Sequence, residues 1–435
     1  MIGVVGTMKL FRFMLVSLFI TFLFTSSSWN TQAQNQSNLL PTTVTNVNAT
    51  TNITLNLTLP SGFILSGNIT GTGGVPLLGG TVTAQSSNAA YSGPITPQGL
   101  GGTYSIVLPA GTYSLSVTRL VLDFMTGDTY FIEQNLGIMV TINGNTTRNL
   151  VLPPLPPTFA VSGNVTGSSA FPPRGGINFT SSDGRIQAVT ELDGSYNLAL
   201  PAASYFVSIS PNVSQPGGIE QGLFIAMGTV TVSGPQTFNF TLPNGVNLSG
   251  VVRRANGSPV PGAVVSATTN VNNPLQATSA TSTVPEQTTT GQYRMTIPAG
   301  TYNVGAITDI DLGQGQEGSL IFPFPFQSLT VAGNQTRDFT VPNTPAVVVI
   351  SGTVRTQQGQ PVAGAVVGAF STTITNTPNV AFGVSTETNS AGMYQLRVLS
   401  GTNYTVEAEP AAAPGGKKPA QKWLERLQSL SQQSF

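Results

Sequence analysis

The sequence predicts an all-β protein, a tandem array of antiparallel β-sandwich domains. The dipeptide Ser-Gly recurs at intervals close to the size of a small domain, beginning at Ser66, Ser162, Ser249 and Ser351. After each Ser-Gly come a Gly-x-Tyr segment and, nine or ten residues further on, a second tyrosine segment. Apolar and polar residues alternate through both tyrosine segments, as they do on a strand that turns one face to a core.

The two tyrosine segments of each copy are expected to form an antiparallel hairpin. In the first copy the core-facing residues are Tyr104, Ile106 and Leu108, followed by Tyr113, Leu115 and Val117. The turn reads Pro-Ala-Gly-Thr in the first and third copies, where Gly111 and Gly300 are expected to take a positive φ. The second copy has Ala203 there, which predicts either about 1 kcal/mol of strain or a different turn.

A Ser-Gly strand precedes each hairpin, and a closing strand that ends in an apolar residue and proline follows it. The closing stretches are Val140–Pro153, Val230–Pro243 and Leu329–Pro342. The fourth copy passes instead into an Ala/Pro/Gly linker at Pro410–Pro419 and has no closing strand. A related stretch, Val47–Pro60, precedes the first Ser-Gly.

These signals divide the chain into units. They are a signal peptide (1–33), a leader strand (34–60), sandwiches at 61–153, 154–243 and 244–342, an incomplete fourth sandwich (343–410), and a linker with an amphipathic tail (411–435). Three arrangements of Val47–Pro60 stay open. Each unit can begin with such a strand; the last domain can be incomplete; or the stretch can complete the last domain of another molecule by strand addition. The third arrangement gives head-to-tail self-association.

Several of these elements stand in a fixed order in the third copy. They are Ser249-Gly250-Val251-Val252, Gly257–Val264, Gly291-Gln292-Tyr293 and Ile297–Val304. In this order the chain, over about residues 61–410, resembles the carboxypeptidase regulatory-like repeat family, whose domains are Ig-like or prealbumin-like β-sandwiches. The resemblance implies non-catalytic modules similar to those on peptidases, surface receptors and sugar-binding enzymes. The family's acidic turn before Gly-x-Tyr remains only at Asp193-Gly194.

The N-terminus predicts export. Lys9 and Arg12 precede the apolar run Phe13–Phe24, and Thr31-Gln32-Ala33 resembles a cleavage site. The run is too short to cross a hydrocarbon layer of about 30 Å as a helix. We expect cleavage after Ala33, with a retained anchor as the alternative. The protein is therefore expected in the periplasm, on the cell surface or outside the cell.

Composition excludes several functions. Only 7% of the residues are charged, the net charge is zero, and lysine occurs only at 9, 417, 418 and 422. A neutral, lysine-free body has no electrostatic footprint for nucleic acid, whose binding depends on neutralising phosphates. Histidine and cysteine are absent, so a zinc site of the usual kind and a Ser-His-Asp triad are excluded. We expect no enzyme activity, cofactor or metal; the acidic loop at Asp309, Asp311 and Glu317 is expected to be solvated rather than to bind calcium.

Two segments are candidates for contact with a ligand or partner. In Phe322-Pro323-Phe324-Pro325-Phe326 the prolines are expected to keep an edge or loop extended, with Phe322, Phe324 and Phe326 on one face. An open face would bind a partner or stack on sugar rings, and a packed one would cover the sandwich. In the tail, Trp423 and nearby leucines recur at helical spacing beside lysines. This favours a short amphipathic helix on an anionic membrane surface or a partner, or else a frayed helix.

The sequence thus favours an exported, non-catalytic structural or adhesion scaffold. Its mechanism would be geometric, with sandwiches joined by stiff linkers such as Pro153–Pro157 into a rod. Polysaccharide or another surface protein would be its partner. The alternative is a carbohydrate-binding protein that uses exposed aromatic side chains.

Overall fold

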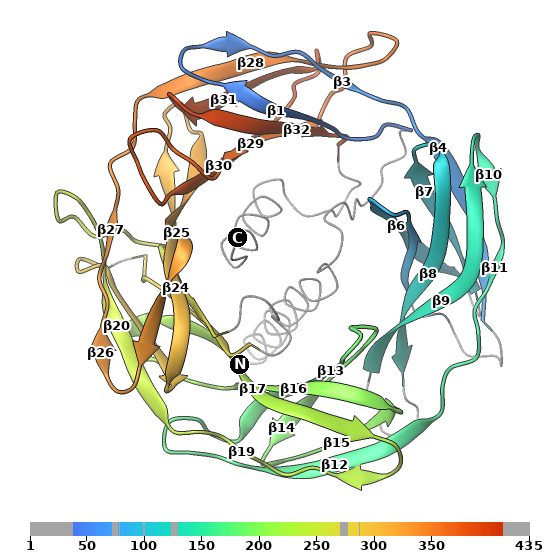
Figure 1. The fold of residues 1–435 in the computed structure, drawn as a ribbon, viewed down its shortest axis with the longest axis vertical. Helices are drawn as coiled ribbons and strands as arrows, with labels where there is room; N and C mark the ends of the chain where they lie inside the picture. Colours follow the sequence, from blue (N-terminus) through green and yellow to red (C-terminus); the bar gives the residue numbers. More distant parts are fainter. Residues whose placement is uncertain are drawn as a thin grey trace, which may run out of the picture.

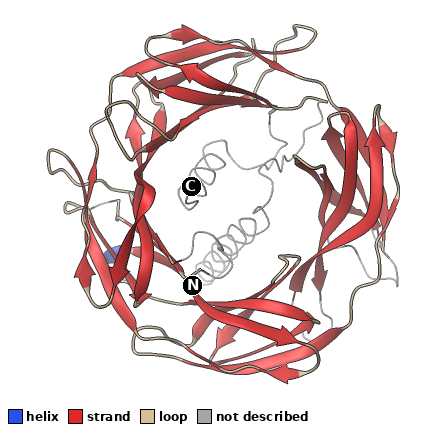
Figure 2. Ribbon diagram, viewed as in Figure 1, coloured by secondary structure: helices blue, strands red, loops and turns tan. Residues whose placement is uncertain are grey.

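The computed structural model describes residues 38–71, 77, 79–98, 101–122, 129–269, 277–286 and 288–411. Over these residues the chain is almost entirely β-strand, and the described helical structure is a single 3₁₀ turn at Pro216–Gly218 (Figure 2). The expected signal peptide (1–33) and the tail with Trp423 lie outside the described residues.

Each copy of the repeat forms two layers of strands, an outer and an inner sheet, and in the first copy the strand Ala90–Gln98 of the inner layer also pairs with Gly101–Leu108 of the outer one. In the outer sheet the Ser-Gly strand lies between the antiparallel Gly-x-Tyr strand and two short parallel closing strands. In sandwich 1 these are β4 (Phe63–Thr70), β7 (Gly101–Leu108), β10 (Thr146–Thr147) and β11 (Leu150–Val151). Its inner sheet contains β5 (Gly80–Gln85), β6 (Ala90–Gln98), β8 (Gly111–Leu122) and β9 (Thr129–Ile142).

The next two sandwiches repeat this plan. Sandwich 2 has outer strands β12 (Thr158–Thr166), β15 (Ser195–Pro201), β18 (Gln236–Thr237) and β19 (Phe240–Thr241), and inner strands β13 (Arg174–Ser181), β14 (Ile186–Asp193), β16 (Ala203–Pro211) and β17 (Glu220–Val232). Sandwich 3 has outer strands β20 (Gly245–Arg254), β23 (Gln292–Pro298), β26 (Gln335–Thr336) and β27 (Phe339–Val341), and inner strands β21 (Val264–Thr268), β22 (Ser279–Thr283), β24 (Gly300–Asp311) and β25 (Glu317–Val331).

The four sandwiches are arranged in a ring (Figure 1). Their inner sheets face the centre and are joined by strand pairing, β9 with β14, β17 with β22, and β25 with β30 (Ala381–Glu387) of sandwich 4. In each case the last strand of one inner sheet is paired with its hairpin partner along one edge, and its other edge pairs with the next sandwich. The expected rod is therefore wrong, because the hairpins join the units edge to edge around a circle.

The eight repeated tyrosines lie inside the sandwiches, which confirms the prediction on which the fold assignment depends. Their exposed fractions are between 0 and 5%. The first tyrosine of each copy donates its hydroxyl to a closing-strand carbonyl, from Tyr104 to Arg148 O (2.7 Å), Tyr196 to Phe238 O (2.8 Å) and Tyr293 to Arg337 O (2.6 Å). The second donates to a carbonyl just upstream, from Tyr113 to Pro109 O (3.1 Å), Tyr205 to Pro201 O (2.8 Å) and Tyr302 to Pro298 O (2.8 Å). Every buried hydroxyl therefore has an acceptor.

The Ser-Gly glycine is required by the same closing-strand carbonyls. A Cβ added at Gly67, Gly163 or Gly250 would lie 2.1, 1.8 or 2.0 Å from the oxygen of Arg148, Phe238 or Arg337. No side chain fits at such distances, because the closing strand crosses directly over the glycine. The recurrence of Ser-Gly and that of Gly-x-Tyr thus have one cause, a carbonyl that contacts both strands.

The hairpin turns differ from the expectation in one respect. Positive φ values occur at many glycines, but neither Gly111, Gly300 nor Ala203 has one. The glycine prediction at this turn was wrong. Alanine is accepted in the second copy because the backbone stays in a region that any residue adopts.

Burial of the tyrosines predicts alkaline unfolding. Desolvation raises the pKa of Tyr104 from 10.0 to about 12 and raises the pKa of Tyr205, Tyr302 and Tyr404 as well. Because the folded pKa exceeds the unfolded one, the stabilisation is complete below pH 10 and is lost as the pH rises through the folded values. We expect tyrosinate absorbance and loss of β-sheet circular dichroism to appear together in a titration. Ionisation near pH 10 with the sheet signal intact would contradict this.

Candidate functional site

The two ends of the repeat array meet in sandwich 4. Strand β1 (Thr42–Asn48) pairs antiparallel with β32 (Asn403–Glu409). Strands β2 (Ile53–Thr54) and β3 (Leu57–Leu59) pair parallel with β28 (Val347–Thr356). The remaining strands are β29 (Val366–Ser371), β30 and β31 (Met393–Leu399). Figure 1 shows the N-terminal and C-terminal strands side by side in this sandwich. We call residues 42–60 the closing segment, and their contacts with β28 and β32 the seam.

The pairing decides among the three expected arrangements of the N-terminal stretch. The closing strands of sandwich 1 pair with β4 of the same copy, so a unit ends with its closing strand rather than begins with one. Sandwich 4 is not incomplete, because the closing segment supplies the strands that its own sequence lacks. The strand-addition arrangement correctly placed the N-terminal stretch against the last sandwich. In the structure, however, the stretch and the sandwich belong to the same molecule.

The closing segment completes the core of sandwich 4. Leu57, Leu59 and Ala49 are at most 2% exposed and belong to the main hydrophobic cluster, together with Val47. Tyr394 donates its hydroxyl to Leu55 O at 2.7 Å, the bond that Tyr104 makes with Arg148. The partners are 44 residues apart in sandwich 1 and 339 residues apart here. In sandwich 4 a hydrogen bond between residues far apart in sequence therefore replaces the more local one of sandwich 1, with the same length and the same kind of partners.

The same carbonyl requires the fourth Ser-Gly glycine. A Cβ on Gly352 would lie 1.9 Å from Leu55 O. Asn52 and Asn56 accept hydrogen bonds from the backbone N–H groups of Val349 (2.9 Å) and Thr353 (3.0 Å). In sandwich 1 the side chains of Asn145 and Asn149 do this for Ile64 N (2.9 Å) and Asn68 N (3.0 Å). The closing segment thus reproduces both the main-chain and the side-chain contacts of a closing strand.

A pair of carboxamides joins the two ends of the chain. Asn48 Nδ2 donates to Asn403 Oδ1 at 3.0 Å, and both residues are exposed. The equivalent position of the other hairpins holds a hydroxyl pair: Thr112 with Thr141 (3.1 Å), Ser204 with Thr231 (3.0 Å) and Thr301 with Thr330 (3.0 Å). The seam therefore has the register of an ordinary hairpin although no turn connects its strands.

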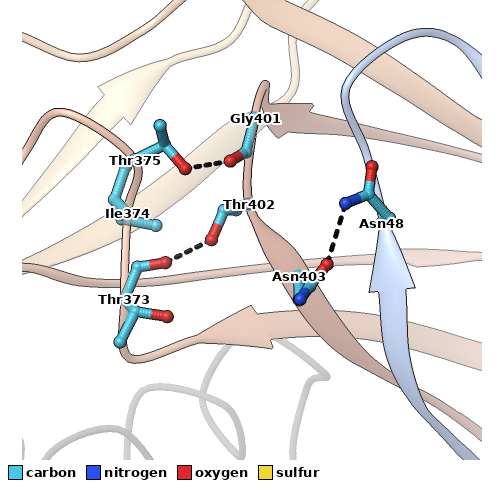
Figure 3. Close-up of a pocket in the computed structure, with 7 residues that line it drawn as sticks. All are labelled: Asn48, Thr373, Ile374, Thr375, Gly401, Thr402 and Asn403. Atoms are coloured by element: carbon cyan, nitrogen blue, oxygen red, sulfur yellow. Dashed lines mark hydrogen bonds between the residues drawn. The ribbon is translucent and has the colours of Figure 1, made fainter.

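A shallow polar pocket of about 240 Å³ lies beside this pair (Figure 3). Its lining residues are Asn48, Thr373, Ile374, Thr375, Gly401, Thr402 and Asn403. The Thr375 hydroxyl donates to Gly401 O, and the Thr402 hydroxyl donates to Thr373 O. The lining contains no charged and no aromatic side chain. It can offer hydrogen bonds to neutral polar groups, but it contains no acid–base pair or activated nucleophile.

Of the two alternatives for the Phe-Pro segment, an open face and a packed one, the structure has the packed one. Phe322, Phe324 and Phe326 are 4, 5 and 7% exposed. Phe322 belongs to the main cluster, whereas Phe324 and Phe326 belong to a second one with Ile307, Ile321 and Ala381. The prediction that all three share a face was wrong. Whether they contact a ligand stays a prediction, although their burial leaves little surface for one.

A bulge explains this division. Val304 pairs with Gln327 and Ala306 pairs with Phe322, so residues 323–326 stand opposite Gly305 alone. The prediction assumed an extended segment in which side chains alternate regularly between the two faces. The bulge interrupts this alternation. A Cβ on Gly305 would lie 2.1 Å from the Phe326 ring, so glycine makes room for it. The pairing of β25 with β30 ends at Ile321, and within the segment Phe324 N donates to Asn379 O of sandwich 4 at 2.6 Å.

Sequence reasoning missed a buried polar contact at the junction of sandwiches 1 and 2. Arg119 is 2% exposed, and its Nη2 donates to Pro153 O at 3.2 Å. Gln134 Nε2 contacts the carbonyls of Pro153 (3.4 Å) and Pro154 (3.3 Å). Burial lowers the pKa of Arg119. The sequence position of Arg119 could have indicated its burial, because Arg119 continues the alternation in which Tyr113, Leu115 and Val117 are buried.

In the part of the chain that the structure describes, there is no candidate for two features, a metal-binding group and a membrane-spanning helix. No group of three or more acidic side chains within it could hold a metal ion. Asp309 Oδ1 accepts from Ser319 Oγ (2.6 Å) and Asp311 Oδ1 from Gly313 N (2.7 Å), so these carboxylates serve the local loop. No helix in the described ranges is long and apolar enough to span a membrane.

The comparisons with known proteins give no family. No family model and no curated protein matches the chain. Among solved structures it is similar to a leucine-rich repeat protein from Bacteroides thetaiotaomicron (13% identity, TM-score 0.18, covering 42% of this chain and 26% of that one). It is also similar to a streptococcal ancillary pilin (13% identity, TM-score 0.18, covering 64% of this chain and 98% of that one). A third similar structure is the Bacillus anthracis TIE protein (11% identity, TM-score 0.16, covering 86% of this chain and 70% of that one).

The chain spans about a quarter of the length of the leucine-rich repeat protein. TM-scores this low do not establish a common architecture. We therefore infer function from the geometry of the chain alone.

The seam predicts a local effect for Leu57→Ala. Leu57 is 2% exposed, and truncation of such a leucine costs about 2–5 kcal/mol. We expect faster hydrogen exchange in β28 and β32, far from the substitution in sequence. The matched control is Leu150→Ala, at the same place in sandwich 1, which should instead affect β4 and β7. Loss of protection around the N-terminal residues alone would contradict the assignment of the closing segment to sandwich 4.

Proposed function

We propose that the protein is an exported, non-catalytic scaffold whose ring-shaped body is held at one point, with a structural or adhesive role at the cell surface or in the periplasm. The observation that carries the proposal is the register of the seam, in which Thr42 lies opposite Ala408. The segments that lead into and out of the ring therefore leave it side by side. A body of this kind displays its outer surface around a single attachment site.

A ring of sandwiches has a different functional consequence from a rod. A rod of sandwiches separates its two ends and acts as a spacer between them. Here the array returns to its start, so the distance between the ends does not grow with the number of units. The geometry supports display of four similar outer sheets rather than separation of two attached parts.

The chemistry of the surface supports a structural role. The described ion pairs, Arg174 with Asp193 (2.9 Å) and Arg185 with Asp183 (3.9 Å), are both exposed. Exposed pairs contribute little to stability, so the sandwiches depend on core packing and backbone pairing. No observation favours the carbohydrate-binding alternative, because the phenylalanines on which it relied are buried and the seam pocket has no aromatic side chain.

Three finer assignments remain part of the proposal. Membership in the carboxypeptidase regulatory-like family is supported by the order of the motifs and by the two-sheet sandwiches that they form. Export is supported by the basic and apolar N-terminal pattern. Contact of the Trp423 tail with an anionic membrane surface or a partner is supported by its lysines and its helical spacing.

Export can be tested with one cysteine. The chain has no cysteine of its own, and Met139 is 65% exposed in the described structure. In cells that produce Met139→Cys, we expect labelling by a maleimide that does not cross the cytoplasmic membrane. The control is Leu115→Cys, at a fully buried position of the neighbouring strand, which should label only after unfolding. Labelling of Met139→Cys only after complete lysis would contradict export.

The ring itself can be tested in solution. We expect small-angle scattering of the purified protein to give a largest dimension close to that of a closed ring of four sandwiches and well below that of four sandwiches placed end to end. Removal of salt should leave the profile unchanged, because few charges contribute to the contacts. An elongated profile several sandwiches long would contradict a body held at one point.

A further inference from the structure

The seam is the one place among the described strands where a sandwich is closed by a distant part of the chain. The side chains that cap the Ser-Gly strand act across 81 residues in sandwich 1, 75 in sandwich 2 and 87 in sandwich 3. In sandwich 4 the separation is 297 residues. The first three sandwiches can therefore close with their own sequence, whereas the fourth closes only when the N-terminal closing segment is brought to it from the other end of the array.

Without the closing segment, sandwich 4 presents a groove of defined chemistry. The antiparallel edge of β32 and the parallel edge of β28 would both lack their partner strand. The hydroxyl of Tyr394 would lose its acceptor, and the places of Leu57 and Leu59 in the core would be empty. Open strand edges beside an apolar groove favour addition of another strand.

The junction between sandwiches 4 and 1 lacks, among the described strands, the inner-sheet strand pairing that joins the other neighbouring sandwiches. Three junctions are made by pairing of inner-sheet strands. Outside the closing segment, the described strand pairings of sandwich 4 are within the sandwich itself or with β25 of sandwich 3. The ring can therefore open at the seam while the other three junctions stay paired.

We infer that sandwich 4 also accepts the closing segment of a second copy of this chain, so that opened rings join end to end. The contacts of the seam involve only residues 42–60 and sandwich 4, and all of them can form between two molecules. The choice between the two states then depends on concentration, because a tethered segment competes at an effective concentration on the order of mM. Two copies that exchange segments reciprocally form a closed dimer, and one-way exchange forms a growing chain.

The absence of cysteine makes a direct test available. We would prepare full-length Asn48→Cys and full-length Asn403→Cys, mix them, unfold and refold them together over a range of protein concentrations, and oxidise. Exchange places the two cysteines opposite each other in different molecules, at the register pair Asn48↔Asn403. We expect a mixed disulfide dimer whose fraction rises with the concentration during refolding.

The matched control is the same experiment with Thr112→Cys and Thr141→Cys. This pair has the same register in sandwich 1, but its strands β8 and β9 are consecutive in one sandwich. We expect no concentration-dependent mixed dimer from it. Mixed dimers in equal amounts from both pairs would show non-specific association and overturn the inference, as would their absence from the seam pair at every concentration.

A second full-length variant checks the geometry. Asn48→Cys/Asn403→Cys in one chain should form a disulfide within the monomer when it is refolded at low concentration. Failure of this bond to form would show that the two positions are not neighbours, and would overturn both the seam and the exchange. Formation of the bond before mixing should abolish exchange with other chains.

Discussion

The structure depends on one repeated constraint, a closing-strand carbonyl that must reach a buried tyrosine hydroxyl while lying against a residue without a side chain. The glycine leaves room for the strand, and the hydroxyl fixes its position along the core. Burial of an unpaired hydroxyl is costly, so a sandwich without this strand is destabilised at its centre. The fourth copy lacks the strand in its own sequence, and Leu55 from the N-terminal end supplies the carbonyl.

Ring formation follows from two features acting together. The last strand of each of the first three inner sheets pairs edge to edge with the next sandwich, and the four sandwiches together form a ring. The first and last units can then meet, and the closing segment joins them through backbone pairing rather than through a covalent link or a metal. The Pro153–Pro154 connection is held by side chains instead, since Arg119 and Gln134 donate to its carbonyls.

Much of each sandwich could be predicted from the sequence, because its signals are local. Alternation around Tyr104 and Tyr113 indicates which residues are buried, and the spacing of Ser-Gly indicates the number of units. The ring could not be predicted in this way. The likeness of Val47–Pro60 to a closing strand predicts that it pairs as one. It does not predict which sandwich the strand closes, because the three arrangements left open by the sequence bury the same side chains. The faces of Phe324 and Phe326 were missed because a bulge changes the alternation that the prediction assumed.

Synthesis proceeds from the N-terminus, so the closing segment is made before the four sandwiches and finds its place only when the fourth has been made. At about 5–20 residues per second, the chain needs roughly tens of seconds to reach β32 after Pro60 has been polymerised. During this interval Leu57 and Leu59 have no core to enter. Translocation of an unfolded chain followed by folding outside the membrane would present both ends at the same time, and a binding chaperone would serve the same purpose. The position of one strand thus ties the folding of this protein to the way in which it is delivered.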